Sequence, residues 1–213
     1  MSRHRSGIPA VRLDGLEVAT PAETILACAR LVSLLDLVVL ADAALHLGHC
    51  TEQELGHAAM QRRRGARALR RALPLLDGRS ESPGETLLRL VHTSSGIRVQ
   101  PQFLVMDGDQ IIARADLRIT GTRRLPEYDG AYHRDPAQYE RDRGRDRRLQ
   151  ALGWEPYSYS ARSVLASPVQ ILRDADEALG RAHVPMRIKR FYDLLNPSSH
   201  TPLGVAQLRA RLG

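Results

Sequence analysis

Residues 110–119, QIIARADLRI, decide the fold, because apolar and charged side chains alternate along them with a period of two. This alternation predicts a β-strand with one buried face and one polar face. The expected buried face carries Ile111, Ala113, Ala115, Leu117 and Ile119. On the polar face, Asp116 lies between Arg114 and Arg118. Acidic residues are depleted in strands, so Asp116 is either half of a cross-strand ion pair or a functional residue.

Two further strands are expected to flank this one. An apolar strand over 102–106 leads into the hairpin turn signal Asp107-Gly108. After a turn at 120–122, a third strand over 124–130 carries Glu127 and Asp129. These two carboxylates are two residues apart, so they share one face of the strand and repel each other unless a cation offsets them.

The remaining signals complete one unit over residues 82–182. Ser82-Pro83-Gly84-Glu85 has the pattern of a capping box, which accounts for Glu85 without any chemistry. The other expected elements are a helix over 139–152, a strand over 154–159 and a helix over 167–182. The predicted fold class is therefore α/β (α+β), with the element order αβββαβα.

Residues 1–78 predict a separate helical region behind an irregular start over 1–19. Capping residues and apolar periodicity place helices at 20–32, 33–47, 51–63 and 65–76. Residues 183–213 are expected to be a tail with one short helix over 188–195. The chain therefore divides into 1–78, 82–182 and 183–213.

Composition restricts the partners and the compartment. The net charge of +7 and a sequence pI of about 10.1 favour a polyanion such as DNA. Six arginines between 62 and 71 form either a solvated face or a phosphate-contacting surface. No apolar run approaches the ~18 residues of a membrane span, and no signal peptide is recognisable. Two cysteines, Cys28 and Cys50, are too few for a disulfide scaffold, so a cytoplasmic protein is expected.

The carboxylates of the second and third strands indicate a metal site. Adjacent strands lie ~4.8 Å apart, so paired strands would bring Asp116 and Glu127 to one hard divalent cation. Mg²⁺, or Mn²⁺ in its place, is the expected ion. An ion of this kind activates water for attack on a phosphodiester and offsets the charge that develops in the transition state.

The order and spacing of these residues resemble a known nuclease family. Asp116, the run Glu127-Tyr128-Asp129-Gly130-Ala131-Tyr132-His133, the helical Asp142, Arg145 and Asp146, and Gly153-Trp154 are similar to the very-short-patch-repair-like branch of the PD-(D/E)XK endonuclease superfamily. The resemblance covers residues 82–182 and implies a restriction-endonuclease-like core. Residues 8–77, with Asp14-Gly15-Leu16 and Thr20-Pro21, resemble the middle region of actinobacterial AbiEi-type antitoxin proteins. In that family a winged helix precedes this region, and we expect none in 1–78.

The resemblance assigns roles to individual residues. It implies that Asp116 and Glu127 bind the metal, that Glu85 orients water and that His133 assists the attacking water. Asp129 stands where the superfamily has lysine, and the only lysine of the chain is Lys189. The resemblance places Asp129 in the catalytic group with these residues. The expected phosphate contacts are Arg141, Arg145 and Arg148.

Two functions follow from these observations, and a third possibility, that the basic charge reflects base composition and the apolar helix over 33–47 binds another protein, stays open. The first is a metal-dependent DNA endonuclease that hydrolyses phosphodiester bonds. The second is a catalytically inactive nuclease-fold module that binds DNA or a partner, such as a toxin, within a type IV toxin–antitoxin antitoxin or regulator. The missing lysine and Pro126, next to Glu127, favour the second function. The retained carboxylates and His133 favour the first.

Overall fold

The fold was analysed in a computed structural model, which describes the backbone of residues 9–130 and 136–213 and the side chains of 9–130 and 143–213. Helices and small sheets together place the protein in the α/β class, as predicted. The chain forms two compact units. Unit 1 comprises residues 1–78 and 196–213, and unit 2 comprises residues 79–195. The last eighteen residues thus group with the N-terminal unit, whereas the sequence suggested a tail over 183–213.

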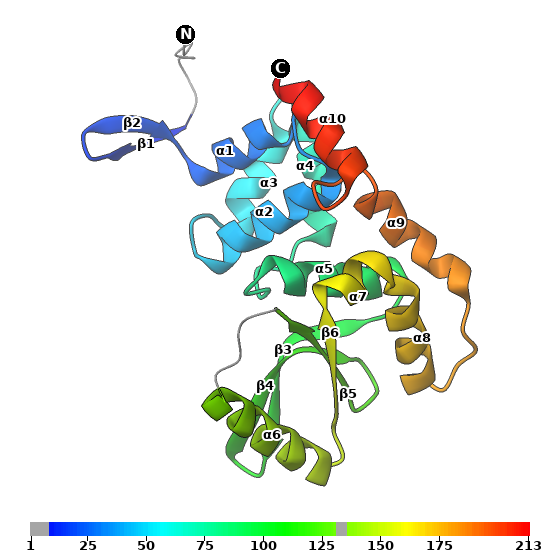
Figure 1. The fold of residues 1–213 in the computed structure, drawn as a ribbon. Coiled ribbons are helices and arrows are strands. Elements are labelled where there is room, and N and C mark those ends of the chain that lie inside the picture. The colour runs from blue at the N-terminus through cyan, green and yellow to red at the C-terminus, as the bar shows by residue number, and fades with distance from the viewer. Residues whose placement is uncertain (1–8, 131–135) are drawn as a thin grey trace. The chain divides into compact units, whose positions relative to one another are not determined.

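Unit 1 begins with a β-hairpin (Figure 1). Strands β1 (Ala10–Leu13) and β2 (Leu16–Ala19) pair antiparallel around Asp14 and Gly15. Both turn residues have positive φ, 49° and 82°, which is the backbone of a type I′ turn. The prediction of an irregular start was therefore wrong for residues 10–19. The Asp-Gly dipeptide was the available signal, but the strands it joins are short and almost wholly exposed.

Capped helices follow the hairpin, close to the predicted positions. They are α1 (Pro21–Cys28), α2 (Leu34–His46), α3 (Glu52–Met60) and α4 (Ala66–Ala72), with a 3₁₀ turn at Leu73–Leu75. Side chains of Thr20, Ser33 and Thr51 accept hydrogen bonds from the N–H groups three residues on, which satisfies donors that have no partner inside the helix. Helix α10 (Pro202–Leu212) was not predicted, and the side chain of Thr201 caps it in the same way.

The C-terminal residues of unit 1 are held to its N-terminal helices by specific contacts. The carboxylate of Asp36, in the first turn of α2, accepts hydrogen bonds from the backbone N–H and the hydroxyl of Ser199 at 3.0 and 2.8 Å. The guanidinium of Arg211 donates to the carbonyl of Leu31 at 2.7 Å. Unit 1 is therefore built from both ends of the chain.

Unit 2 has the predicted order of elements, with an additional short helix after the last strand (Figure 1). In sequence these are α5 (Pro83–Ser94), β3 (Val99–Asp107), β4 (Gln110–Ile119), β5 (Arg124–Asp129), α6 (Pro136–Ala151), β6 (Glu155–Ser160), α7 (Ala161–Ala166) and α8 (Pro168–Ala178). A 3₁₀ turn at Pro185–Ile188 and α9 (Lys189–Leu195) end the unit. Helix α5 packs against β3 and β5, while α6 packs against β4 and β6.

The strands of unit 2 form two ladders. Strands β3 and β4 pair antiparallel, and β5 pairs in parallel with β6. Strands β4 and β5 lie side by side, but no backbone ladder joins them. The edge of β5 that faces β4 lacks free donors for a ladder. Pro126 has no N–H, and the next N–H on this edge, that of Tyr128, is donated to the side chain of Asp116. Pro126 does not shorten the strand, which continues to Asp129.

A bulge alters the predicted buried face of β4. Ala113, Ala115, Leu117 and Ile119 are buried as predicted, but Ile111 is 57% exposed. The β3–β4 register shifts between Val105 and Met106, so one extra β4 residue interrupts the alternation. Beyond the bulge the core holds Val105, Ala113, Ala115, Leu125 and Leu149, with Phe103, Ile112, Leu152 and Trp154 packed against it.

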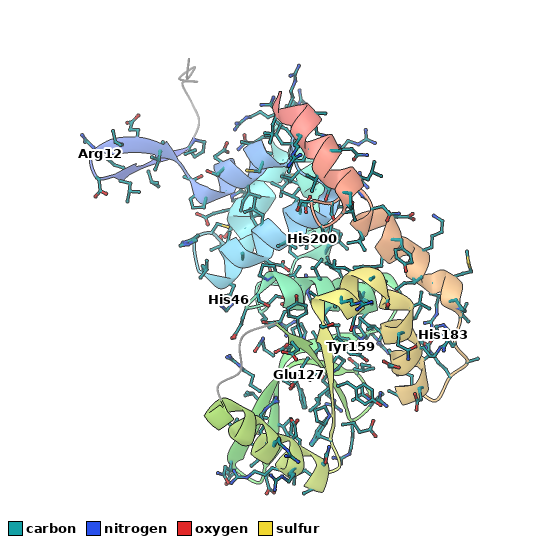
Figure 2. The ribbon with its side chains drawn as sticks, viewed as in Figure 1. Arg12, His46, Glu127, Tyr159, His183 and His200 are labelled. Atoms are coloured by element: carbon teal, nitrogen blue, oxygen red, sulfur yellow. The ribbon has the colours of Figure 1, made fainter. Side chains whose placement is uncertain are left out.

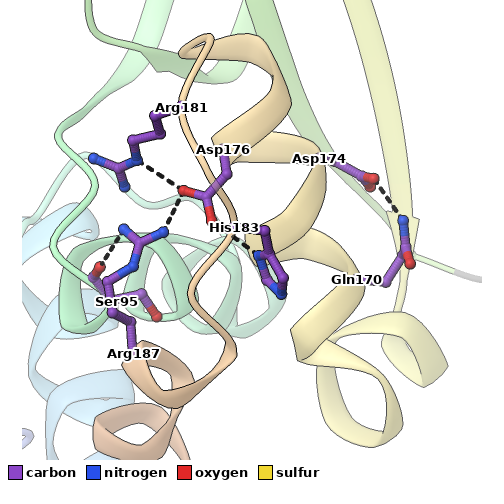
Figure 3. A network of polar contacts seen from close by, with 7 residues as sticks. All are labelled: Ser95, Gln170, Asp174, Asp176, Arg181, His183 and Arg187. Carbon is purple, nitrogen blue, oxygen red and sulfur yellow. Dashed lines mark hydrogen bonds and ion pairs between the residues drawn. The ribbon is translucent and has the colours of Figure 1, made fainter.

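A polar network ties the end of α8 to the chain that follows it (Figure 3). The buried carboxylate of Asp176 accepts from Arg181 at 2.8 Å, from His183 at 2.9 Å and from Arg187. Burial raises the pKa of Asp176, but these hydrogen bonds outweigh burial and hold that pKa below its ordinary value. The carboxylate is therefore ionised and fixes the loop between α8 and α9. No helix within 9–130 and 136–213 is long and apolar enough to cross a membrane.

Candidate active site

The site is centred on Asp116, in the middle of β4. Its Oδ2 accepts the backbone N–H of Tyr128 at 2.7 Å, so the carboxylate takes the place of a ladder acceptor for β5. Among the residues whose side chains are described, Asp116 forms no ion pair, so the alternative of a cross-strand ion pair does not hold. Arg114 instead pairs with Glu81 at 2.6 Å. The carboxylate is thus placed by the backbone of the adjacent strand and carries no cation of its own.

Glu127, on the strand next to Asp116, is paired with a cation. Both of its carboxylate oxygens accept hydrogen bonds from Arg145 of α6, with Oε2 at 2.9 Å from the guanidinium. Figure 2 shows Glu127 on β5, close to Tyr159 on the parallel β6. The bidentate contact raises the pKa of the Arg145 guanidinium, which is charged throughout. Arg145 was expected to contact phosphate, and here it contacts the site carboxylate.

Glu85, in the first turn of α5, reaches the same site. Ser82 caps its N–H at 3.2 Å, which is one half of the predicted capping box; the other half, a bond from the Glu85 carboxylate to the N–H of Ser82, is not formed. The carboxylate instead accepts the backbone N–H of Glu81 and the side-chain amide of Gln102, each at 2.9 Å. The helix cap and the site therefore use the same residue.

Gln102 has an unusual backbone. The register pairs Pro101 with Leu117 and Phe103 with Ala115, so Gln102 lies opposite Asp116 where the ladder is interrupted. Its φ of 53° is in the left-handed region, which side chains other than glycine adopt rarely and at a cost of about 1–3 kcal/mol. Strain of this kind gathers at functional sites. No sequence signal marked Gln102.

Burial and the neighbouring charges shift the pKa of Asp116. Burial raises its pKa to about 6; the Tyr128 hydrogen bond and the charge of Arg145 act in the opposite direction, and the carboxylates of Glu85 and Glu127 add to the rise. The charges of Glu85 on α5 and Glu127 on β5 thus act on Asp116 on β4, together with the charge of Arg145. An added cation would be stabilised at this point.

Asp116 and Glu127 supply the carboxylate oxygens that a hard cation prefers, but Arg145 already contacts those of Glu127. Mg²⁺ is usually held by one or two carboxylates and keeps its remaining waters, so Asp116 and Glu127 suffice in chemistry and number. Within the described side chains, no three His, Cys, Asp or Glu residues are placed to hold one ion together. Arg145 occupies both oxygens of Glu127, and an ion ligated by Glu127 must displace it.

The other expected site residues are placed as follows. Asp129 ends β5 opposite Ser160, two residues from Glu127 on the same edge of the strand. Arg148 is exposed on α6. His133 and the side chain of Arg141 lie outside the described residues. The proposed roles of His133 and Arg141 therefore stay predictions.

Tyr128 and Gly84 belong to the site, although their roles were not predicted. A side chain at Gly84, on the first turn of α5, would overlap the ring of Tyr128. This close approach holds the start of α5, and with it Glu85, against the strand whose N–H positions Asp116. The Ser-Pro-Gly-Glu pattern predicted the helix start, but no local signal shows which ring the glycine faces.

A second polar cluster lies deeper in unit 2. The Nδ1 of His92, on α5, bonds to the carbonyl of Leu88 at 2.8 Å, and its Nε2 has no partner among the described residues. Burial lowers the pKa of His92 to about 4, despite the opposing charge of Asp174. Asp174 accepts the hydroxyl of Tyr159 at 3.0 Å, and burial raises the pKa of that hydroxyl. His92 is therefore a neutral core residue.

Comparison with known proteins finds relatives in one organism. "Uncharacterized protein MT2308" of Mycobacterium tuberculosis (strain CDC 1551 / Oshkosh) and "Uncharacterized protein Rv2248" of M. tuberculosis (strain ATCC 25618 / H37Rv) are each 32% identical to this chain over 158 residues. The match covers 72% of this chain and 58% of each relative. No family model matches the sequence. No solved structure matches it either.

Proposed function

We propose that unit 2 is a metal-dependent endonuclease domain that hydrolyses phosphodiester bonds in DNA, with Asp116 and Glu127 as ligands of Mg²⁺ or Mn²⁺. The observation that carries this proposal is the placement of Asp116 on β4, where the N–H of Tyr128 holds its carboxylate, no described cation pairs with it, and the carboxylates of Glu85 and Glu127 lie near enough to act on it. The order of elements and the resemblance of residues 82–182 to very-short-patch-repair-like endonucleases support it.

The residues of the chain have distinct tasks in this proposal. The N–H of Tyr128 orients the Asp116 carboxylate, and Gln102 orients that of Glu85. A bound Mg²⁺ supplies a Lewis acid that stabilises negative charge developing on the phosphate. Arg145 holds Glu127 when no ion is present, and on release its guanidinium is free to contact a phosphate oxygen. His133 is the proposed base, because no lysine is near the site.

One observation favours a second candidate. The guanidinium of Arg145 fills both oxygens of Glu127, so it neutralises this one carboxylate without any metal. A nuclease fold with such an internal counter-charge suits a module that binds DNA or a protein partner, such as a toxin, without cleaving. The proposed compartment for either function is the cytoplasm.

A plasmid-nicking assay tests the proposal. Cleavage of supercoiled DNA should require Mg²⁺ or Mn²⁺, stop in EDTA and be lost in Asp116→Asn and Glu127→Gln. The matched control is Asp109→Asn, which removes an exposed carboxylate from the turn between β3 and β4 and should keep activity. Metal binding is measured separately by titrating Mn²⁺ calorimetrically into each variant.

The two candidates give different results in these measurements. Mn²⁺ binding with metal-dependent cleavage, both abolished by Asp116→Asn, supports the endonuclease. DNA binding without Mn²⁺ binding and without cleavage refutes the endonuclease and supports the inactive module.

A further inference from the structure

Arginine side chains line two adjoining cavities in unit 1, far in sequence from the acidic site. One cavity, of about 400 Å³, is lined by Ala27, Arg30, Arg62, Arg63 and Arg64. The other, of about 480 Å³, is lined by Arg30, Leu31, Arg64, Gly65 and Arg211. Because Arg30 and Arg64 line both cavities, we treat the two as one arginine groove. None of its lining residues is acidic or aromatic.

The fold of unit 1 builds this groove from three separate segments. Gly65 has a φ of 95°, and a side chain there would collide with the carbonyl of Leu26 in α1. The chain over 62–64 is therefore pressed against the end of α1, which Arg30 follows directly. Arg211, in the last turn of α10, joins them through its hydrogen bond to Leu31.

Only one of the clustered arginines is neutralised by an acid. Arg63 forms an ion pair with Glu23, whose side chain is 3% exposed, and Gln61 donates to the same carboxylate. This buried pair fixes the segment in place. Arg30, Arg62 and Arg64 are exposed and form no ion pair with any residue that the structure describes. The groove thus has unpaired positive charge on a fixed backbone.

Helix dipoles account for only part of this arrangement. Arg30 and Arg211 lie at the C-terminal ends of α1 and α10, where a positive charge is stabilising. Arg62 follows the C-cap of α3 as Arg30 follows that of α1, whereas Arg64 lies at no C-terminus of a described helix, and both add like charge beside Arg30. Like charges that lie together repel, so an anion in the groove would stabilise the cluster.

The side chains that line the groove favour some anionic partners over others. Guanidinium groups match phosphate oxygens in a bidentate geometry. The groove has no aromatic side chain on which unpaired bases would stack, which disfavours single strands. It has no large apolar anchor of the kind that dominates protein interfaces. Its described lining residues also include no Asn or Gln, the amide side chains that read adenine edges.

We propose that the arginine groove binds the phosphodiester backbone of duplex DNA without sequence preference, with Arg30, Arg62 and Arg64 as the phosphate contacts. Such contacts position a duplex and release counterions, which makes the affinity fall with salt. The groove belongs to unit 1, and its binding requires neither a metal nor the carboxylates of unit 2.

The test is fluorescence anisotropy of a labelled duplex with the full chain in EDTA, so that no metal-dependent cleavage occurs. Arg62→Gln/Arg64→Gln is compared with Arg67→Gln/Arg71→Gln, which removes the same charge from exposed arginines of α4 outside the groove. The groove variant should lose at least about tenfold in affinity at low salt. The slope of log K against log[salt] should become shallower by about 1.8, or 0.9 for each lost phosphate contact. The control should lose less than about threefold.

Three outcomes would overturn the proposal. They are no binding of the duplex by the unaltered chain, equal losses in the two double variants, and stronger competition by polyglutamate than by unlabelled duplex, which would point to an acidic protein. The measurement is made in EDTA and depends on no residue of the acidic site, so failure of the endonuclease proposal leaves it unaffected. Unchanged unfolding midpoints of both double variants establish that the fold is intact.

Discussion

Gln102 lies across from Asp116 at the interruption in the β3–β4 ladder, with a left-handed backbone and a side-chain amide that donates to Glu85. Gln102 thus lies opposite one carboxylate and donates to another, with its backbone in an unfavourable conformation. In a regular strand, the side chain of a glutamine would be directed to one face of the sheet by the alternation of the pleat. The strain at Gln102 allows it to reach the helix instead.

Substitutions at Gln102 should separate strain from positioning. Gln102→Ala keeps the strain, whereas Gln102→Gly removes it. The free energy of unfolding of Gln102→Gly should therefore exceed that of Gln102→Ala by about 1 kcal/mol. Both lose the hydrogen bond to Glu85, so both should lower metal-dependent nicking. Urea unfolding and the nicking assay measure the two effects. Equal stability of the two variants would show that the backbone of residue 102 stores no strain.

The pH dependence of stability should report on Asp116. Its pKa of about 6 in the folded state is above the ordinary 3.8, so ionisation destabilises the folded protein as pH rises through this range. In EDTA, Asp116→Asn should unfold with the same free energy as the unaltered chain near pH 4. Near pH 8 the variant should be more stable, by at most about 3 kcal/mol. Asp109→Asn is the control, because it removes an exposed carboxylate that lies outside the site. A flat profile for Asp116→Asn would contradict the raised pKa.

Arg145 should compete with metal for Glu127. Arg145→Gln leaves the half-buried Glu127 carboxylate without its cation and should cost about 1–2 kcal/mol of stability in EDTA. The same change should tighten Mn²⁺ binding, because both oxygens of Glu127 become available. Arg148→Gln removes an exposed charge from the same helix and should do neither. Unchanged Mn²⁺ affinity in Arg145→Gln would show that the site does not take the ion through Glu127.

The contact between Gly84 and Tyr128 should be intolerant of a methyl group. Gly84→Ala places a side chain inside the ring of Tyr128 and should cost about 1–3 kcal/mol. Gly144→Ala adds the same methyl group in open space on α6 and should be neutral or stabilising by up to about 1 kcal/mol. Combining Gly84→Ala with Tyr128→Ala should recover part of the loss. Additive effects in this cycle would mean that the two residues are not in contact.

Acid should destabilise unit 2 through His92. The folded pKa of about 4 is below the ordinary 6.5, so the unfolded chain takes up the proton first. Stability should fall by at most about 3 kcal/mol as pH drops from 6.5 to 4. His92→Gln should remove this part of the acid dependence, whereas His57→Gln, at an exposed position on α3, should retain it. An unchanged acid limb in His92→Gln would contradict the buried neutral form.

Local patterns in the sequence predicted most elements, because caps and periodicity act over a few residues. The bounds of β4, Gln110–Ile119, follow directly from its alternation. Thr20-Pro21 predicted α1, while the identical pair Thr201-Pro202 marks the start of the unpredicted α10. The signal for α10 was therefore present in the sequence.

Contacts between distant segments could not be predicted in this way. The sequence placed acidic residues on adjacent strands, but nothing local shows that Arg145 reaches Glu127 or that Gln102 reaches Glu85. The bulge that turns Ile111 outward depends on how β3 and β4 pair. These features arise from tertiary packing, which fixes side-chain partners only after the strands have paired.

The residues that complete unit 1 come after unit 2 in the chain, with Ser199 held by Asp36 and Arg211 by Leu31. The ribosome therefore synthesises all of 79–195 before it synthesises 196–213, the second segment of unit 1. During synthesis the surface of the N-terminal helices that contacts Ser199 and Arg211 stays exposed to solvent until α10 has been made. A nascent chain stalled before residue 196 would carry every residue of the acidic site, but its arginine groove would be without the α10 wall.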